Sequence, residues 1–388
     1  MTCKSTLMLA GMTAMWMSGG AAQAGPNDIL VGLDSKIVYG VEGTGNVKPG
    51  QDAVLVMDVS DPAHPKIRAS LPLVNSLVGP PTNLQIAQNG RLGLVANSLV
   101  WVQDGAAWKQ APDDKLYVID LAAAPPKLVD TVTVGKQPSG LAIAHGGRLA
   151  LIGNRAGKSV SVVSIDAMSV KTVGEVVLGQ EVAAVAITPD GKRAFAVMNL
   201  ANKVGVLTID GSTVTYDKAL DIPAGFNPYN IDITPDGKFA MVSCTGAGGF
   251  NGDAIVTIDT TGAHPHVVDL MTPGTGPEGF AISPDGKFAV TALLLGTGNR
   301  QADHAYVKGG QAVLMSIGAG GRLSVVNRLP LGGLPEGVAF SPTGNFVYIG
   351  NYIDSNMQVF RIVGGRLVAV GGAIKLPGQP ASMRALAR

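Results

Sequence analysis

Short apolar runs separated by turn residues fill most of the chain. Residues 185–187 form one run, residues 194–197 form the next, and residues 204–209 form a third. Runs of this length that are rich in Val and Ile and bounded by Gly, Pro, Asn or Asp are typical of β-strands. No segment of the sequence has sustained helical periodicity. The pattern therefore predicts an all-β protein.

A six-residue turn phrase punctuates these runs. Ile-Thr-Pro-Asp-Gly-Lys occupies residues 187–192 and 233–238, a Ser variant occupies 282–287, and weaker copies occupy 86–91, 143–148 and 340–345. Pro presets φ, Asp caps the turn backbone, and Gly supplies a positive φ. The turn glycines are spaced by 57, 44, 46, 49 and 58 residues: Gly90, Gly147, Gly191, Gly237, Gly286 and Gly344. Four strands in a unit near this length form the blade of a β-propeller.

A seventh unit is split between the two ends of the chain. Residues 29–32 begin it, residues 37–40 resemble the strand that follows a turn, and residues 53–59 and 67–71 read as its third and fourth strands. Its missing inner strand is supplied by residues 380–386, which resemble residues 138–143 and 335–340. We therefore predict a seven-bladed β-propeller of four-stranded antiparallel blades, closed by the C-terminal strand, because a closed ring pairs exposed strand edges. The alternative, a stacked β-solenoid, needs no such terminal strand.

The first 24 residues read as a cleaved signal peptide. Lys4 precedes a short apolar run at residues 7–17, and Ala22-Gln23-Ala24 is a small-x-small cleavage site. The run is shorter than the roughly 20 apolar residues that span a bilayer, so we expect no membrane span in the mature chain. A buried N-terminal helix is the alternative. These observations predict one domain, residues 25–388, in a periplasmic or secreted protein.

Composition narrows the possible partners. Lys and Arg total 29 against 28 Asp and Glu, a balance that does not predict a nucleic-acid partner. The 46% of hydrophobic residues excludes a disordered chain. Of the two cysteines, Cys3 leaves with the signal peptide, and Cys244 ends an apolar run, where a small core side chain is expected.

The turn phrases also resemble a known repeat. Residues 335–351, Pro-Glu-Gly-Val-Ala-Phe-Ser-Pro-Thr-Gly-Asn-Phe-Val-Tyr-Ile-Gly-Asn, and residues 187–199 resemble the YVTN-type β-propeller repeat. That group is similar to the seven-bladed lactonase-like family, which includes bacterial 6-phosphogluconolactonase. The resemblance implies the propeller fold and a site with Glu, His and Arg at one end of the channel. Its relatives include enzymes, non-catalytic subunits of redox enzymes and surface-layer proteins, so the fold alone does not give the function.

Propeller geometry assigns each connection to one of two faces. We call the face with the second-to-third loops and the blade-to-blade crossings the mouth. His145 lies in a first-to-second turn, and His64, His264 and His266 lie in third-to-fourth turns, so these four belong to the opposite face. His264 and His266 alternate along an extended segment and could hold a metal, but a solvated turn is the simpler interpretation. Only His304 falls at the mouth, and we predict no metal site.

Two connections at the mouth are longer than the repeat requires. We predict loops at residues 98–114, with Trp101 and Trp108, and at residues 295–311, with Arg300, Asp303, His304 and Tyr306. Long loops on a rigid scaffold are frequent binding sites, although surface decoration without a function is the alternative. Exposed indoles reduce solubility unless they cover something, so we predict that both tryptophans bind a ligand, together with Asp303 and Tyr306.

The blade-to-blade crossings place acids around the channel. Glu278 and Glu336 occupy identical Pro-Glu-Gly settings in consecutive blades, and Tyr229 takes the same position one blade earlier. Two carboxylates with a histidine and a cation can perform acid–base chemistry. We predict Glu278, Glu336, His304 and Arg300 as catalytic residues, with Tyr229 and Arg155 binding ligand and Arg155 as an alternative cation.

Three further positions interrupt a preference for Ala near the channel axis. Gln85, Asp232 and Arg384 replace the Ala found at the matching position of other crossings. A buried polar group needs a partner, so we expect an internal hydrogen-bond network or buried water there. A ligand site lining the channel is the alternative.

Two functions remain open at this point. The first is a secreted lactonase-like hydrolase that acts on a small polar lactone or related metabolite at the mouth. The second is a non-catalytic propeller that binds a partner protein or ligand, for example as a subunit or accessory of a redox enzyme. The cofactor is unknown. The literal Gly-x-Gly-x-x-Gly match at residues 274–279 precedes a strand rather than a helix, so it does not predict a dinucleotide site.

Overall fold

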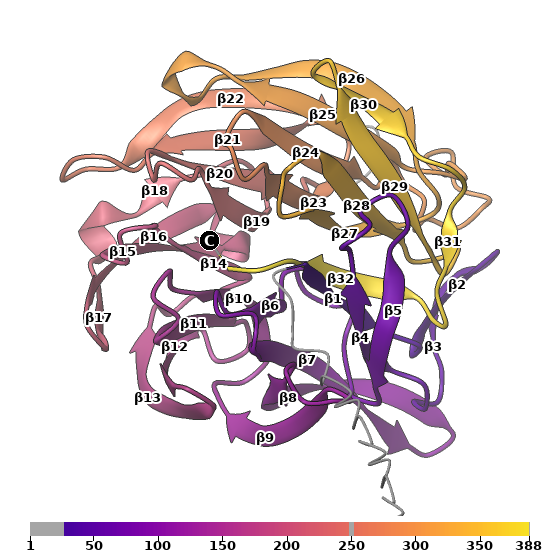
Figure 1. Ribbon diagram of the computed structural model, residues 1–388, viewed down its shortest axis with the longest axis horizontal. Helices are drawn as coiled ribbons and strands as arrows, with labels where there is room; N and C mark the ends of the chain where they lie inside the picture. Colours follow the sequence, from indigo (N-terminus) through magenta and orange to yellow (C-terminus); the bar gives the residue numbers. More distant parts are fainter. Residues whose placement is uncertain (1–26, 248–251, 388) are drawn as a thin grey trace, which may run out of the picture.

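The described residues form a ring of seven antiparallel β-sheets around a central channel (Figure 1). The computed structural model describes residues 27–247 and 252–387; the predicted signal peptide and Cys3 lie outside them. Helical structure in these ranges is limited to three 3-10 turns, η1 (Asn199–Ala201), η2 (Lys218–Leu220) and η3 (Ala319–Gly321). No described helix has the length and apolar character needed to cross a membrane. The all-β, seven-bladed prediction is confirmed.

The first four blades follow one plan, in which the strands succeed one another from the channel outward. Blade 1 contains β32 (Pro380–Arg384), β1 (Asp28–Leu33), β4 (Ala53–Asp58) and β5 (Lys66–Leu71). Blade 2 contains β6 (Leu84–Ile86), β7 (Leu92–Asp104), β8 (Ala107–Asp120) and β9 (Lys127–Thr133). Blade 3 contains β10 (Pro138–Ile143), β11 (Leu149–Asn154), β12 (Ser159–Asp166) and β13 (Ser169–Val177). Blade 4 contains β14 (Ala184–Ile187), β15 (Arg193–Met198), β16 (Lys203–Asp210), β17 (Thr213–Tyr216) and the short β18 (Ile222–Pro223).

The remaining blades repeat this arrangement. Blade 5 contains β19 (Pro228–Ile233), β20 (Phe239–Cys244), β21 (Asp253–Asp259) and β22 (His266–Gly274). Blade 6 contains β23 (Pro277–Ile282), β24 (Phe288–Leu293), β25 (Gln311–Ile317) and β26 (Leu323–Pro330). Blade 7 contains β27 (Pro335–Phe340), β28 (Phe346–Asn351), β29 (Asn356–Val363), β30 (Arg366–Ala369) and the short β31 (Ile374–Lys375).

The two ends of the chain build blade 1 together. β32 pairs antiparallel with β1, with Leu30 opposite Arg384 and Gly32 opposite Ser382. After β32 the tail continues inside the ring (Figure 1) and crosses to blade 2, where Leu386 forms a bridge with Ile86. Closure through the C-terminal strand is therefore confirmed. It pairs the inner edge of β1, which would otherwise be open to association.

The turn phrase folds as its composition predicts. Gly191 has φ 68°, a conformation that side-chain-bearing residues rarely adopt. Asp190 accepts hydrogen bonds from the Lys192 backbone N–H at 3.0 Å and from the Thr188 hydroxyl at 2.6 Å. The phrase therefore fixes a tight connection between the first and second strands of a blade.

The apolar core lies between neighbouring blades and leaves the axis free. One cluster joins Leu94 and Val118 of blade 2 to Leu141 and Ile152 of blade 3, and comparable clusters follow around the ring. Because each sheet is covered on both faces, inner strands such as β11 are buried at every position and read as continuous apolar runs.

Two sequence expectations about the mouth are wrong. Residues 98–114 are not a loop, because β7 and β8 continue into a long hairpin with Trp101 opposite Gln110. Residues 37–40 are not the second strand of blade 1, because β1 takes that place. They form β2 (Ile37–Gly40), which pairs with β3 (Gly43–Asn46) in a separate hairpin. Each hairpin is a second-to-third connection and so lies on the mouth side.

Candidate functional site

Three connections meet beside the mouth. The β2–β3 hairpin is linked to residues 294–310 by a hydrogen bond from the Gln301 N–H to the Val41 carbonyl at 3.2 Å. The Gln110 amide on β8 donates to Asn46 on β3 at 3.3 Å. Beneath these contacts lies an apolar group that we call the mouth cluster: Ile37, Leu77, Leu99, Trp101, Leu334, Tyr352 and Ala381, with Tyr39 and Trp108 at its edge. The cluster ties blades 1, 2 and 7 together.

A buried lysine anchors the base of the β2–β3 hairpin. Lys36 is fully buried, and its ammonium group pairs with Asp34 at 2.9 Å and with Asp52. It also donates to the Asn75 carbonyl and lies 4.9 Å from the centre of the Trp101 ring. Burial raises the pKa of Asp34 although the Lys36 charge opposes the rise. A buried ammonium group is tolerated in the interior only because each of its N–H donors has a partner.

Two tyrosines hold the hairpin in place above this base. The Tyr352 hydroxyl, which is fully buried, donates to the Ile37 carbonyl at 2.8 Å. The Tyr39 and Tyr352 rings meet edge to face with their centres 5.9 Å apart, a favoured aromatic geometry. The hairpin thereby carries Tyr39 to the mouth.

Glu278 and Glu336 form the centre of the site. Their side chains are hydrogen-bonded to each other. Glu336, on β27, is 2% exposed, whereas Glu278, on β23, is half-buried. The glycine of the Pro-Glu-Gly phrase explains this closeness, because a Cβ on Gly279 would lie 1.9 Å from the Glu336 carbonyl oxygen. Only glycine lets the two inner strands approach so closely.

The surroundings of the pair favour its protonated forms near neutral pH. Burial raises the pKa of Glu278 to about 7, against the opposing effects of the Glu336 hydrogen bond and the Arg155 charge. Burial, the Glu278 charge and the shared hydrogen bond all raise the pKa of Glu336 well above its usual range. Glu336 therefore donates and Glu278 accepts, as expected for two carboxyl groups in one site. The second oxygen of Glu336, Oε2, has no hydrogen-bond partner within the described ranges.

One cation and two phenols lie around the pair. Arg155 lowers the pKa of Glu278. The Arg155 guanidinium lies 6.0 Å from the Tyr229 ring centre and 3.6 Å from the Glu181 carboxylate. The charges of the pair add to burial in raising the pKa values of Tyr229 and Tyr39, so both hydroxyls lie within electrostatic reach of the pair and stay protonated.

The predicted residues of the 294–310 loop are exposed or half-buried. Arg300 is 63% exposed, pairs with Asp303 at 3.0 Å, and runs beside Gly43 of the hairpin. His304 is exposed and Tyr306 is half-buried. Arg155, not Arg300, is the cation whose charge acts on Glu278.

Trp101 belongs to the mouth cluster, and Trp108 packs against its edge. Trp101 is 6% exposed, with Lys36 above its ring, and Trp108 is half-buried. The histidines of the opposite face, His64, His145, His264 and His266, are all exposed. Within residues 27–247 and 252–387, no group of three His, Cys, Asp or Glu side chains is placed to hold a metal ion.

Tyr39 and Glu181 were missed by the sequence analysis. Tyr39 belongs to a segment whose alternation fits a blade strand, so the sequence offered no signal for its place at the mouth. Glu181 lies in the crossing before β14 (Ala184–Ile187), two residues from the aligned position, and a comparison confined to that position overlooks it.

Known proteins resemble this chain in structure but not closely in sequence. No family model and no curated protein sequence matches it. A periplasmic gluconolactonase from Pseudomonas aeruginosa superposes with a TM-score of 0.68 at 20% identity, covering 92% of this chain and 98% of that one. A 6-phosphogluconolactonase-like protein from Bacteroides uniformis gives 0.68 at 16% identity with the same coverage. A chain of Kuenenia stuttgartiensis hydrazine synthase gives 0.60 at 19% identity, covering 80% of this chain and 90% of that one. The chain is thus a seven-bladed propeller with the fold of gluconolactonase-type and 6-phosphogluconolactonase-like propellers.

Proposed function

We propose that this protein is a secreted hydrolase that opens small polar lactones at the mouth of the channel. One observation carries the proposal: the buried Glu336 and the half-buried Glu278 are hydrogen-bonded to each other near a cation, and both carboxyl groups have raised pKa values. A site with one carboxylate and one carboxylic acid holds a base and an acid at the same pH. Lactone opening needs both, because water must lose a proton and the ring oxygen must gain one.

The reaction divides between the two glutamates. Glu278, as the carboxylate, takes a proton from water, and the hydroxide oxygen bonds to the lactone carbonyl carbon. The Arg155 guanidinium, with the Tyr229 hydroxyl, stabilises the charge that develops on the carbonyl oxygen. The ring C–O bond then breaks, and Glu336 donates its proton to the departing oxygen. Lactone and water become one hydroxy acid, and proton exchange between the glutamates restores the pair.

The fold and the N-terminus support the compartment in this proposal. A periplasmic gluconolactonase has a similar fold, and residues 1–24 have the features of a secretory signal. Arg300 and His304 are exposed and Asp303 and Tyr306 are half-buried on a second-to-third connection, so we assign them to substrate entry. In the proposal they guide the lactone toward the pair.

Purified protein lacking residues 1–24 tests the proposal against a lactone panel. Glucono-δ-lactone, its 6-phosphate and γ-butyrolactone are incubated with the protein, and acid release is followed by pH-stat titration. We expect turnover of at least one sugar lactone. Glu278→Gln and Glu336→Gln should each lower kcat/KM by at least about 10²-fold, since acid–base catalysis contributes that much.

Matched variants separate chemistry from folding. Glu42→Gln changes an exposed glutamate at the tip of the β2–β3 hairpin and should keep wild-type kcat. Arg300→Gln and His304→Gln should raise KM with little change in kcat. Equal activity of Glu278→Gln and Glu42→Gln would contradict the assignment of the base.

The pH dependence follows from the proton shared by the pair. Glu278 acts as a base only when ionised, so kcat/KM should rise as pH increases through about 7. Glu336 acts as an acid only when protonated, and its pKa is the higher of the two, so activity should fall again at more alkaline pH. Hydroxy-acid formation is measured by chromatography from pH 5 to 10, with spontaneous hydrolysis subtracted. A flat profile across this range would exclude the pair from the chemistry.

A second candidate function is partner binding without catalysis. It is favoured by apolar side chains on the projecting hairpins: Val38 is 40% exposed, Val41 59% and Val102 46%. The hydrazine synthase structure with a similar fold fits this candidate. Absence of acid release from every lactone would favour it over the hydrolase.

A further inference from the structure

The channel contains a second cavity toward the end opposite to the mouth. Neither Glu278 nor Glu336 lines it. Its volume is about 420 Å³, within the roughly 300–1,000 Å³ typical of ligand sites. The exposed side chains of Gln88 and His145 lie at its rim together with the prolines of the turn phrases. The cavity therefore opens on the face away from the mouth.

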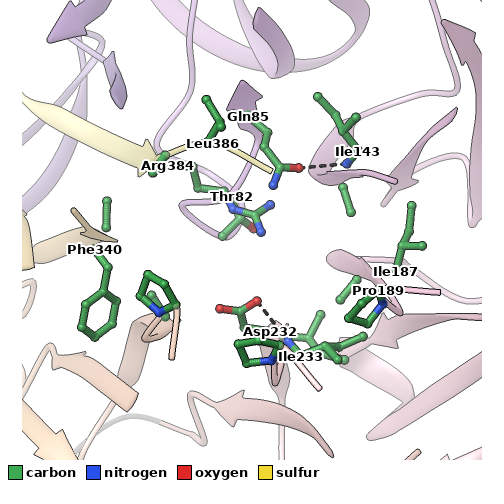
Figure 2. Close-up of a pocket in the computed structure, with 18 of the residues that line it drawn as sticks. Thr82, Gln85, Ile143, Ile187, Pro189, Asp232, Ile233, Phe340, Arg384 and Leu386 are labelled. Atoms are coloured by element: carbon green, nitrogen blue, oxygen red, sulfur yellow. Dashed lines mark hydrogen bonds between the residues drawn. The ribbon is translucent and has the colours of Figure 1, made fainter. Parts of the chain in front are cut away.

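Three polar side chains from different blades point into this cavity (Figure 2). They are Gln85 on β6, Asp232 on β19 and Arg384 on β32, the positions where the sequence departs from Ala. Figure 2 shows Asp232 across the cavity from Gln85 and Arg384. A charge of each sign therefore lines the same space.

Each of these side chains is held by a neighbouring backbone. Gln85 Oε1 accepts from the Ile143 N–H at 2.8 Å, and Asp232 Oδ2 accepts from the Ile282 N–H at 2.9 Å. Arg384 Nη1 donates to the Leu141 carbonyl at 2.7 Å. Each of the three polar groups thus has a backbone partner in another blade, and these bonds orient the groups before any ligand arrives.

The backbone contacts do not use all the hydrogen-bonding capacity of Gln85 and Asp232. Gln85 accepts through its oxygen, which leaves its NH2 group to donate on the cavity side. Asp232 accepts one backbone N–H at each oxygen, and a carboxylate oxygen accepts more than one hydrogen bond. The rest of the wall is mostly apolar, with Ile143, Phe280 and Phe340 among its residues. Polar groups fixed within an apolar cavity are typical of a small-molecule site.

We propose that this cavity binds a small zwitterion with an apolar side chain, of the α-amino-acid class. A ligand carrying only a carboxylate would place its charge near Asp232, and one carrying only an amine would place it near Arg384. A zwitterion satisfies both, with its carboxylate on Arg384 and the Gln85 amide and its ammonium on Asp232. The apolar walls take its side chain.

Isothermal titration calorimetry with three related probes tests the charge requirement. L-Leucine carries both groups, 4-methylpentanoate lacks the ammonium, and isoamylamine lacks the carboxylate. Purified protein lacking residues 1–24 should bind L-leucine at least about tenfold more tightly than either analogue. No binding of L-leucine or L-phenylalanine, or equal affinity for all three probes, would overturn the proposal.

Two charge variants assign each end of the ligand. Asp232→Asn keeps one oxygen for the Ile282 N–H and loses the acceptor of the Ile233 N–H within the same strand. It should weaken L-leucine binding at least about tenfold without weakening 4-methylpentanoate. Arg384→Gln should weaken L-leucine and 4-methylpentanoate but not isoamylamine. Thermal melting confirms that each variant is folded, and Glu278→Gln should bind L-leucine as the wild type does. Wild-type L-leucine affinity in both cavity variants would refute the assignment.

Discussion

Deletion of residues 380–388 should prevent the protein from forming a stable monomer. Without β32, the inner edge of β1 loses its antiparallel partner, and all six residues of β1 are buried. Met383 also leaves a core cluster that includes Val31 and Tyr348. An unpaired apolar edge promotes aggregation, and native domains are stable by only roughly 5–15 kcal/mol, so we expect the loss of an inner strand to prevent folding. Size-exclusion chromatography and far-ultraviolet circular dichroism measure the outcome.

A shorter truncation provides the control for this experiment. Removal of Arg388 alone leaves β32 and the Leu386 bridge to Ile86 intact, so the variant should elute and melt like the wild type. A synthetic peptide of residues 380–388, added during refolding, should recover some monomer from the deleted chain. If the deleted chain is monomeric with native cooperativity, closure through the C-terminus does not hold the ring together.

Lys36→Met should lower the free energy of unfolding strongly. The substitution leaves Asp34 and Asp52 buried without the cation that both contact. Breaking a buried ion pair on one side costs about 3–5 kcal/mol, and we expect a loss of this size in the free energy of unfolding. The unpaired carboxyl groups are protonated more easily in the folded than in the unfolded state. The loss should therefore be greater at pH 8 than at pH 5. Urea denaturation at both pH values provides the measurement.

Two further variants show whether the charge itself is responsible. Lys48→Met removes an exposed lysine of the same connection and should change the free energy of unfolding by less than about 0.5 kcal/mol. Adding Asp34→Asn and Asp52→Asn to Lys36→Met should recover much of the loss, because no buried charge then remains. A Lys36→Met protein as stable as Lys48→Met would show that the triad does not anchor the hairpin.

The ring was predictable because its signals are local and repeated. A Pro-Asp-Gly turn has the same conformation in every blade that carries it, and residues 380–386 share the pattern of other inner strands. The hairpins at the mouth were not predictable, because the signals that place them are neither local nor repeated. Residues 37–40 have the alternation of a blade strand. In the folded ring, however, β1 takes the place beside β4 that these residues would have occupied. Residues 98–114 exceed the repeat length, which suggested a loop, whereas the strands simply extend.

The candidate site was predictable only where the repeat fixes its residues. The identical settings of Glu278 and Glu336 indicated that the two acids meet, and Gly279 allows the contact. The sequence left both Arg300 and Arg155 as possible cations, because which loop turns its arginine inward depends on packing. Tyr39 was hidden because its approach depends on the buried Lys36 and on Tyr352. Residues fixed by the repeat were foreseen, and those placed by contacts between connections were not.

The split blade also bears on how the chain is made. Synthesis is vectorial, so six blades can assemble while the seventh waits for the last residues to emerge. Until then the inner edge of β1 has no partner strand. Final docking of β32 is a ring-closing step between residues some 350 positions apart, Leu30 and Arg384, and contacts of such long range form slowly. Maturation of the native ring should therefore be limited by the arrival of its tail.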